Sequence, residues 1–544
     1  MMARHWLEGA ALYQIYPLSF RDGNDDGWGD LKGVLAGLDH VASLGVDAIW
    51  LSPFYTSPLA DFGYDVADHC AVDPRLGSLA DFDRVLEKAH RLGLRVLVDL
   101  VMGHTSIQHA WFQESRRSRD NPKADWFLWA DPNPDGTAPN NWLSVFGGPA
   151  WSWEPRRRQY YLHHFLPQQP TLNFRCPAAL DAMLDVARFW LARGVDGFRV
   201  DAVDFLARDP GLRSNPAVEE HPYDFPAKLF GMQIHAHDMM HGDIRHVLER
   251  LGAVVAEFPD RVLLGELSSQ KGAAERIALY TRPGGLHAAY TLDLPKRPFT
   301  PAHFRTALMA ADDYGNTCWS FSNHDVERAA SRWRPAGADP ARFEALLALL
   351  MSCLPGTVCL YQGDELGLPQ ADLAYEDLRD PFGLNFWPEF KGRDGSRTPI
   401  PWTPSAPHGG FCANSATPWL PLAPEHLARA VAVQDRRNAS TLAIWRAALN
   451  LRRTYPLLKN GRTTHVDEDG TILAFARADK RQRITCAFNF GTDTASYALP
   501  DAGGVTPIGL PRPPGTPEPA LSGSTLTLPP LGVFLGLSED PRRT

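Results

Sequence analysis

Gly197-Phe198-Arg199-Val200-Asp201 is a short, mostly apolar run that ends in a carboxylate. A helical pattern from Leu180 to Arg193 precedes it and stops at Gly194, so the run is predicted to be a strand that follows a helix. Asp201 then stands at the carboxyl end of that strand. Taken alone, such an aspartate has a second interpretation, because it is also a common cap of a following helix.

The same arrangement recurs along the chain. Further apolar runs end in polar groups at Val262 to Glu266, Cys318 to Asp325 and Arg95 to His104. In a (β/α)8 barrel the parallel strands bring their carboxyl ends to one mouth, where the loops carry the chemistry. The repetition therefore predicts an α/β protein with a (β/α)8 TIM barrel. Two carboxylates at one mouth suggest cleavage of a glycosidic bond.

These runs closely resemble the motifs of glycoside hydrolase family 13, the amylase clan, and the resemblance covers essentially the whole chain. It is closest to the exo-acting α-glucosidases and oligo-α-glucosidases. It implies that Asp201 is the nucleophile, Glu266 the general acid/base and Asp325 the stabiliser of the transition state. Arg199 is expected to keep Asp201 ionised, and neighbouring carboxylates are expected to raise the pKa of Glu266. No cofactor is expected for the chemistry.

The resemblance also divides the chain. Residues 1–104 and 174–455 are expected to form the barrel, with an irregular subdomain at about 366–430. Residues 105–173 interrupt the alternation of helices and strands, and such a long connection is usually functional or a domain in its own right. The family inserts its domain B there, after strand 3. Residues 456–544 change to short strands and are expected to form a C-terminal antiparallel β-sandwich.

Family α-glucosidases bind the terminal glucose in a closed pocket. By resemblance, Tyr64 stacks on that sugar, Asp65 accepts hydrogen bonds from it, and Arg397 pairs with Asp65 to seal the pocket, so that only a chain end enters. On the residues alone, Tyr64 and Asp65 fit a simple turn equally well, and Arg397 fits an ordinary surface arginine. The other expected sugar-binding residues are His104, Phe146, Phe165, Gln169, Arg199, Phe205 and His324.

A loop after the first expected strand carries oxygen side chains at alternate positions, at Asp22, Asn24, Asp26 and Asp30. This alternation is a pattern by which a loop wraps a hard cation. A similar loop in the family holds Ca2+ or Mg2+, which implies a structural ion here, with the backbone carbonyl of Trp28 as a further ligand. A solvated turn rich in Asp and Gly is the alternative.

Length, net charge, apolar runs and cysteine usage limit the kinds of binding partner and the cellular location that we expect. The chain has 544 residues, a net charge of −9 and no Lys/Arg run longer than Arg156-Arg157-Arg158, so no nucleic-acid surface is expected. The most apolar helix candidate, 345–354, is too short to span a membrane. Seven scattered cysteines and an N-terminus without a secretory pattern predict a cytoplasmic protein with reduced thiols. We expect a monomer or homodimer acting on a small neutral sugar.

By this resemblance we expect a retaining α-glucosidase that acts on small α-glucosides such as maltose or sucrose. Transglucosylation is a second reaction that the resemblance allows. Ala202 is small where α-1,6-specific relatives tend to carry Val, which favours α-1,4 or mixed linkages. One alternative is a sucrose-converting, glucosyl-transferring or isomerising enzyme with the same carboxylates. Another is a non-catalytic sugar-binding or transporter-associated relative, against which the three retained carboxylates argue.

Overall fold

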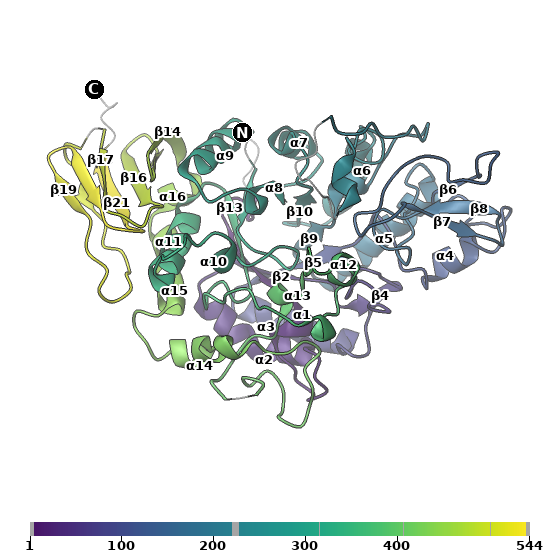
Figure 1. Cartoon of the computed structure of the whole chain (residues 1–544), viewed down its shortest axis with the longest axis horizontal. Coiled ribbons are helices and arrows are strands. Elements are labelled where there is room, and N and C mark those ends of the chain that lie inside the picture. The colour runs from purple at the N-terminus through teal and green to yellow at the C-terminus, as the bar shows by residue number, and fades with distance from the viewer. Residues whose placement is uncertain (1–4, 220–227, 315, 406, 501, 540–544) are drawn as a thin grey trace.

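The structure is a computed structural model that describes residues 5–219, 228–314, 316–405, 407–500 and 502–539. At its centre eight parallel strands follow the order β11-β10-β9-β5-β2-β1-β13-β12 (Figure 1). A parallel bridge between Ala289 and Thr317 joins the two end strands, so the sheet closes into the predicted barrel. The barrel strands are β1 (Ala11–Ile15), β2 (Ala48–Leu51), β5 (Arg95–Leu100), β9 (Gly197–Val200), β10 (Val262–Leu267), β11 (Ala288–Thr291), β12 (Cys318–Ser320) and β13 (Thr357–Tyr361).

A helix returns the chain after each barrel strand and packs on the outside. Local signals set the helix ends: Ser78 and Asp81 form a capping box at the start of α3, and Gly194 ends α5 in the left-handed conformation with φ 107°. The eight helices are α2 (Leu31–Ser43), α3 (Leu79–Arg91), α5 (Pro177–Arg193), α6 (Ile244–Val255), α7 (Ala273–Tyr280), α9 (Pro301–Tyr314), α11 (Pro340–Cys353) and α15 (Thr441–Thr454).

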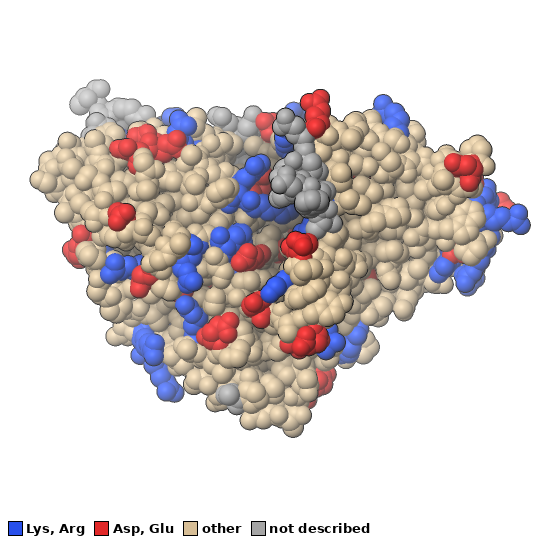
Figure 2. All heavy atoms as spheres, in the orientation of Figure 1, with Lys and Arg blue, Asp and Glu red and all other residues tan. Residues whose placement is uncertain are grey.

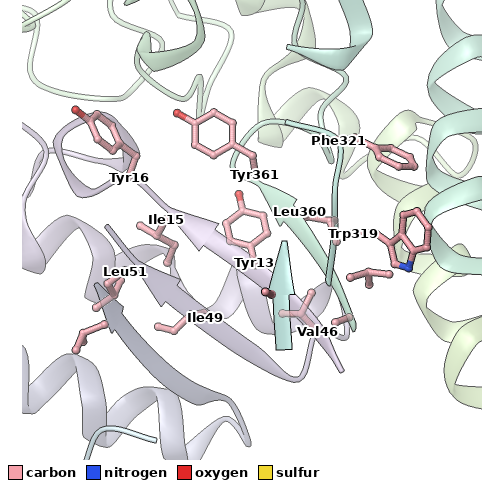
Figure 3. Packing of buried hydrophobic residues seen from close by; sticks show 14 of the residues in the cluster. Tyr13, Ile15, Tyr16, Val46, Ile49, Leu51, Trp319, Phe321, Leu360 and Tyr361 are labelled. Carbon is pink, nitrogen blue, oxygen red and sulfur yellow. The ribbon is translucent and has the colours of Figure 1, made fainter. Parts of the chain in front are cut away.

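Side chains alternate between the inside and the outside of the barrel. Tyr13 and Ile15 of β1 belong to the large core between strands and helices, part of which Figure 3 shows. Along β10, Val262 and Leu264 belong to a separate apolar cluster made by alternate residues of the barrel strands. Glu266 is the next residue of β10 on that face. The alternation therefore turns a carboxylate into the barrel at the end of an apolar strand.

The long connection between β5 and α5 forms a small unit of its own. It contains α4 (Ala110–Ser115) and three antiparallel strands in the order β6-β8-β7, namely β6 (Trp129–Ala130), β8 (Gln159–Leu162) and β7 (Trp151–Glu154). Trp142 and Trp151 centre its apolar cluster. A bridge between His104 and Thr171 holds its base to the end of β5. The unit occupies the right side of Figure 1, at the place expected for domain B.

The C-terminal strands form two antiparallel sheets, at the left of Figure 1. One face of the larger sheet shares the barrel core through Phe475 and Phe488, and its other face packs on the smaller sheet through Ile472 and Phe534. This is the predicted sandwich. The larger sheet contains β14 (Arg462–Asp469), β15 (Ile472–Ala478), β16 (Gln482–Asn489), β21 (Val533–Glu539) and β18 (Thr506–Pro507); the smaller contains β17 (Ala495–Ala498), β20 (Thr525–Leu528) and β19 (Ala520–Ser522).

The surface carries charges of both signs. Figure 2 shows Lys and Arg mixed with Asp and Glu over the visible face, with no broad field of one sign. No helix in the described ranges combines the length and the apolar character needed to cross a membrane.

Candidate active site

A cavity of 1180 Å³ opens at the carboxyl ends of the barrel strands. Asp201, Glu266 and Asp325 all line it, although they are far apart in the sequence. Six of the residues expected to bind sugar also line this cavity: Tyr64, His104, Phe146, Phe165, Gln169 and Phe205. The barrel thus brings the predicted carboxylates and most of the predicted sugar-binding residues to one site, as parallel strands do.

Arg199 connects the acidic groups from inside the barrel. Its Nη1 donates to Oδ1 of Asp99 and to Oδ1 of Asp201, each at 2.7 Å, and its Nη2 lies 2.7 Å from Oε2 of Glu266. The hydroxyl of Tyr290 accepts from Nε at 3.0 Å and from Nη2 at 2.8 Å. Four N–H groups of the guanidinium therefore donate hydrogen bonds, and Nη2 also forms the ion pair with Glu266. One fully buried cation fixes the positions of three carboxylates.

A tight turn after β9 holds Glu266 from the other side. Ala202 adopts the left-handed conformation, with φ 44°, and opens the short 3-10 helix η1 (Val203–Phe205). In this conformation its backbone N–H donates to Oε2 of Glu266 at 3.1 Å. The nucleophile candidate and the acid/base candidate are thus joined by both a side chain and a backbone turn.

The environment favours a proton on the Asp201/Glu266 pair. Burial raises the pKa of Glu266 to about 7 against the attraction of Arg199, and the carboxylates of Asp201 and Asp325 add to the rise. Burial likewise raises the pKa of Asp201 to about 7, with Asp99 and Asp325 adding to it and Arg199 opposing it. The rise at Glu266 agrees with expectation. At Asp201 the effect of burial exceeds the pairing with Arg199 that was expected to dominate.

The pKa of Asp325 is lowered, in contrast to the pKa values of Asp201 and Glu266. Burial opposes its ionisation, but His324, Arg393 and Arg397 outweigh burial and hold the pKa of Asp325 below its usual range. Oδ1 of Asp325 accepts from Nη1 of Arg393 at 3.0 Å and from Nη2 of Arg397 at 3.1 Å, and Nε2 of His324 lies 3.1 Å from Oδ2. Asp325 therefore remains an anion in the cavity when the other two carboxyls share a proton.

The predicted pair of Asp65 and Arg397 is wrong. The carboxylate of Asp65 closes its own turn, because it accepts from Oγ of Ser57 at 2.8 Å and from the backbone N–H groups of Ala60 at 2.9 Å and Asp61 at 3.0 Å. Asp65 does not line the cavity. Nε of Arg397 instead donates to the carbonyl of His324 at 2.7 Å, behind Asp325.

The ion pair across the cavity joins Asp61 and Arg393. Nη2 of Arg393 lies 2.7 Å from Oδ1 of Asp61, and the same guanidinium contacts Asp325 and Asp380. Both members of the Asp61–Arg393 pair line the cavity. An Asp–Arg ion pair therefore lines the cavity, but each partner lies four residues before the expected one.

Two predicted histidines hold other pocket residues in place, His104 from the cavity lining and His324 from behind it. The ring of His324 stacks on that of Tyr64 with centroids 5.1 Å apart, and its Nδ1 lies 2.8 Å from Nε2 of Gln14. His104 reaches the carbonyl of Tyr64 at 2.9 Å and Nε2 of Gln169 at 3.2 Å. Burial lowers the pKa of His104 to about 4, so this imidazole is neutral at neutral pH.

Five phenylalanines form one side of the cavity, which we call the phenylalanine wall. Their rings contact one another in sequence: Phe205 to Phe165 at 5.1 Å, Phe165 to Phe146 at 6.2 Å, Phe146 to Phe382 at 5.0 Å and Phe382 to Phe390 at 4.8 Å. All five residues line the cavity. Aromatic faces suit either a sugar ring or another flat group.

Sequence reasoning missed four residues of this site: Asp61, Asp99, Tyr290 and Arg393. Asp99 could have been found, because it follows Leu97 on the inward face of the same strand. Nothing in the sequence singled out Tyr290. Asp61 and Arg393 each lie four residues before a predicted position, but the side chain that faces the cavity could not be chosen from spacing alone.

The loop from Asp22 to Asp30 is held by its own carboxylates. Asp22 accepts from the backbone N–H groups of Asn24, Asp25 and Gly27, and Asp30 caps α2 by accepting from Gly33 at 2.6 Å. Within the described part of the chain, no group of three or more His, Cys, Asp or Glu side chains is arranged to hold a metal ion.

Comparison with known proteins agrees with this architecture. The family model for the alpha-amylase catalytic domain matches residues 14–461. A probable alpha-glucosidase of Rhizobium meliloti is 49% identical over 507 residues, covering 91% of each chain, and an oligo-1,6-glucosidase of Heyndrickxia coagulans is 33% identical over 91% of this chain and 94% of the other. The crystal structure of an alpha-glucosyl transfer enzyme, XgtA, has a TM-score of 0.94 at 49% identity, covering 98% of this chain and 100% of that one. The chain belongs to the alpha-amylase family of glycoside hydrolases.

Proposed function

We propose that this chain is a retaining α-glucosidase that removes α-linked glucose from the non-reducing end of disaccharides and short oligosaccharides. The observation that carries the proposal is the single guanidinium of Arg199 in contact with both Asp201 and Glu266. Retaining enzymes need their two carboxyls ~5–5.5 Å apart, whereas inverting enzymes need ~6.5–9.5 Å. Two carboxylates on adjacent nitrogens of one guanidinium support the shorter spacing.

The proposed reaction has two steps. Glu266, whose raised pKa supplies a proton at neutral pH, protonates the glycosidic oxygen while Asp201 attacks the anomeric carbon and the aglycone leaves. Water then attacks the glucosyl ester, Glu266 removes its proton, and Asp201 is released. Asp325 stays ionised and binds sugar hydroxyls more strongly in the oxocarbenium-like state, which lowers the barrier.

The Asp61–Arg393 pair supports exo-action. It lies at the cavity wall beside Asp325, where a terminal glucose would be held, and both side chains are largely buried. A polymer chain threading past that point would have to separate a desolvated ion pair, which is unfavourable. Chain ends and disaccharides avoid this penalty.

A panel of substrates tests the function. Glucose release from maltose, isomaltose and sucrose, with little from starch, is the expected result, and NMR should show α-glucose as the first anomer. In Asp201→Asn, kcat should fall by at least about 10⁴-fold, because the nucleophile is removed. Ordinary turnover by that variant would refute the assignment of Asp201, and rapid cleavage of starch would refute the sealed pocket.

Glucosyl transfer is the second candidate function. Two observations favour it: the cavity extends along the phenylalanine wall, which could hold an acceptor, and the similar XgtA structure is described as an alpha-glucosyl transfer enzyme. The balance depends on whether water or a sugar reaches the glucosyl intermediate. Product analysis at high maltose concentration measures it directly, as the ratio of new oligosaccharides to free glucose.

We further propose that the loop 22–30 binds a structural Ca2+ or Mg2+. Its donors are carboxylates and an amide, the chemistry that such ions require, from Asp22, Asn24, Asp26 and Asp30, with the carbonyl of Trp28 as the remaining ligand. Asp22 and Asp30 are buried, and neither forms an ion pair with a Lys or Arg of the described residues. A buried carboxylate without a cationic partner fits a bound cation.

Two properties of the whole protein complete the proposal. All seven cysteines are free thiols in the structure, which supports a cytoplasmic location. The same enzyme is proposed to act as a monomer or a homodimer, which sedimentation equilibrium would decide.

A further inference from the structure

Two lysines line the cavity without an acidic partner. Nζ of Lys228 lies 3.1 Å from the ring centroid of Phe390 and 4.4 Å from that of Phe382, at one end of the phenylalanine wall. Nζ of Lys296, at the end of α8 (Asp293–Lys296), donates to Oγ of Ser269 at 3.0 Å. No carboxylate in the described ranges forms an ion pair with either amine.

The positive charge of Lys228 is not neutralised by the charged groups around it. They are the cations Lys296 and Arg393 and the anion Asp380. Oδ1 of Asp380 lies 2.8 Å from Nη2 of Arg393, so that carboxylate is already paired. Burial and the repulsion from Lys296 lower the pKa of Lys228 to about 8, which leaves most of the amine protonated at neutral pH.

Lys296 faces carboxylates that are likewise engaged elsewhere. The anions that act on it are Asp325, Glu266 and Asp293. Glu266 lies on Arg199, and Asp293 is 3.0 Å from the guanidinium of Arg297. Lys296 is an exposed residue that lines the cavity, and partial desolvation there lowers the pKa of its amine.

Among the other cations that line the cavity, Lys391 and Arg393 are paired with carboxylates, and Arg332 donates to the backbone carbonyls of Glu327 and Phe321. Lys391 is paired with Asp372, and Arg393 contacts three carboxylates. Glu327 and Glu389 also line the cavity, but neither is among the charges that act on Lys228 or Lys296. Lys228 and Lys296 thus line the cavity as cations without an ion-pair partner, which an anionic group of a ligand would supply.

The position of Lys296 assigns these charges to the aglycone side. The Asp61–Arg393 pair lines the same cavity, with Arg393 in contact with Asp325. Glu266, the proposed general acid, acts on Lys296, and a general acid must face the oxygen of the leaving aglycone. A group attached to the aglycone would therefore lie near Lys296, and Lys228 is close enough to Lys296 for the two amines to repel each other.

We propose that Lys228 and Lys296 form a subsite for an anionic group, a phosphate or a carboxylate, carried by the aglycone of the substrate or by the acceptor. The inference rests on the proposed α-glucosidase function and specifies its substrate class. Both ammonium groups can make charge-assisted hydrogen bonds to such an anion. The glucose that is transferred remains neutral.

Matched substrate pairs test the subsite. Phenyl α-glucoside against 4-carboxyphenyl α-glucoside probes a carboxylate, and trehalose against trehalose 6-phosphate probes a phosphate. The measured quantity is the ratio of kcat/KM for the anionic member to kcat/KM for the neutral member. We expect a ratio of about ten or more for the protein as it exists in at least one pair. Lys228→Gln and Lys296→Gln should each lower that ratio by about tenfold, and Lys391→Gln, which removes an already paired lysine, should not.

The outcomes distinguish failure of the anionic subsite from failure of the α-glucosidase function. A preference in only one pair identifies the anion as phosphate or carboxylate. A ratio of one or less in both pairs, or a ratio that both lysine variants leave unchanged, would overturn the subsite while hydrolysis of the neutral members upholds the α-glucosidase. No turnover of any of the four compounds would refute the function, and the subsite with it.

Discussion

At the scale of single residues, the site depends on one arginine that contacts several partners at once. Arg199 donates to Asp99, Asp201 and Tyr290 through four N–H groups, and its Nη2 also forms the ion pair with Glu266. Because each contact fixes the plane of the guanidinium, losing one partner changes how the others are held. Tyr290 is the only uncharged partner among them, so it can be altered without changing the charge of the site.

Tyr290→Phe should lower kcat/KM by about tenfold, since freeing two N–H groups lets Arg199 turn. The freed donors can turn only towards carboxylates, which favours their ionised forms, so the alkaline limb of the pH–kcat/KM profile should move to lower pH. The matched control is Tyr280→Phe, which removes a buried hydroxyl 3.3 Å from Asp204, outside the cavity. An unchanged pH profile in Tyr290→Phe would mean that Tyr290 only fills space.

Glu266→Gln should be more stable than the parent protein above neutral pH. The folded pKa of Glu266, about 7, is above its ordinary value of 4.5, so its carboxyl favours folding fully below pH 4.5, and this contribution is lost as the pH rises through 7. Gln keeps the oxygen that accepts from Ala202 and carries no charge. We expect a Tm higher by about 1–3 °C at pH 8, with a gain that shrinks towards pH 4.5.

Calorimetry over this pH range checks the prediction, with Glu327→Gln at the exposed rim of the cavity as control. A gain that does not depend on pH would show that packing, and not ionisation, is responsible.

Residue-level prediction succeeded where strand geometry orients a side chain and failed where a loop does. Asp201 and Glu266 end regular strands, so alternation alone turns them inward. Asp61 and Asp65 share one turn, and an aspartate in a turn can bind the backbone instead of a ligand. Asp65 does so, and the φ of 110° at Gly63 shows how sharply the chain bends between the two.

At the scale of elements, the barrel could be predicted because several of its strands carry their own signals, whereas β11 was not singled out in the sequence. The polar ends of four strands, the cap residues and Gly194 place them without tertiary information. The unit between β5 and α5 could not be derived in the same way. Its strands have two to four residues, and its tryptophans find their neighbours only after the chain has folded.

Removing divalent cations should destabilise the loop 22–30 and the start of α2. Dialysis against EDTA is expected to lower the Tm by several degrees, and added Ca2+ or Mg2+ should restore it by mass action. Asp26→Asn should reduce the response because it removes a ligand charge. Asp25→Asn, at an exposed neighbour outside the ligand pattern, serves as the control. A Tm that EDTA leaves unchanged in the parent protein would contradict the ion.

At the scale of the whole molecule, the C-terminal sandwich is a structural part of the barrel. Phe299 of the barrel stacks on Phe490 with ring centroids 4.2 Å apart, and Phe475 and Phe488 belong to the barrel core. Arg452 of α15 is almost completely buried and donates to the carbonyls of Leu354 and Gly356 at the base of the barrel.

Truncation after Tyr455 should therefore prevent folding. The barrel helices α9 and α11 would expose the apolar surface that now faces the larger sheet, and burying one phenylalanine alone contributes about 1.5–3 kcal/mol. Soluble yield and a far-UV CD melting curve of the shortened chain measure the effect. A cooperative melt with glucosidase activity would show that the predicted boundary at 455 separates independent domains.

The sequence separation of Asp61 and Arg393 limits how early in synthesis their ion pair can form. Its two residues are 332 positions apart in the chain. At ribosomal speeds of about 5–20 residues per second, roughly 20–60 s pass between the synthesis of one partner and that of the other. The nascent chain carries its nucleophile and its acid/base well before its glucose pocket can close. The pair therefore cannot form before residue 393 has been synthesised, when 151 of the 544 residues are still to be added.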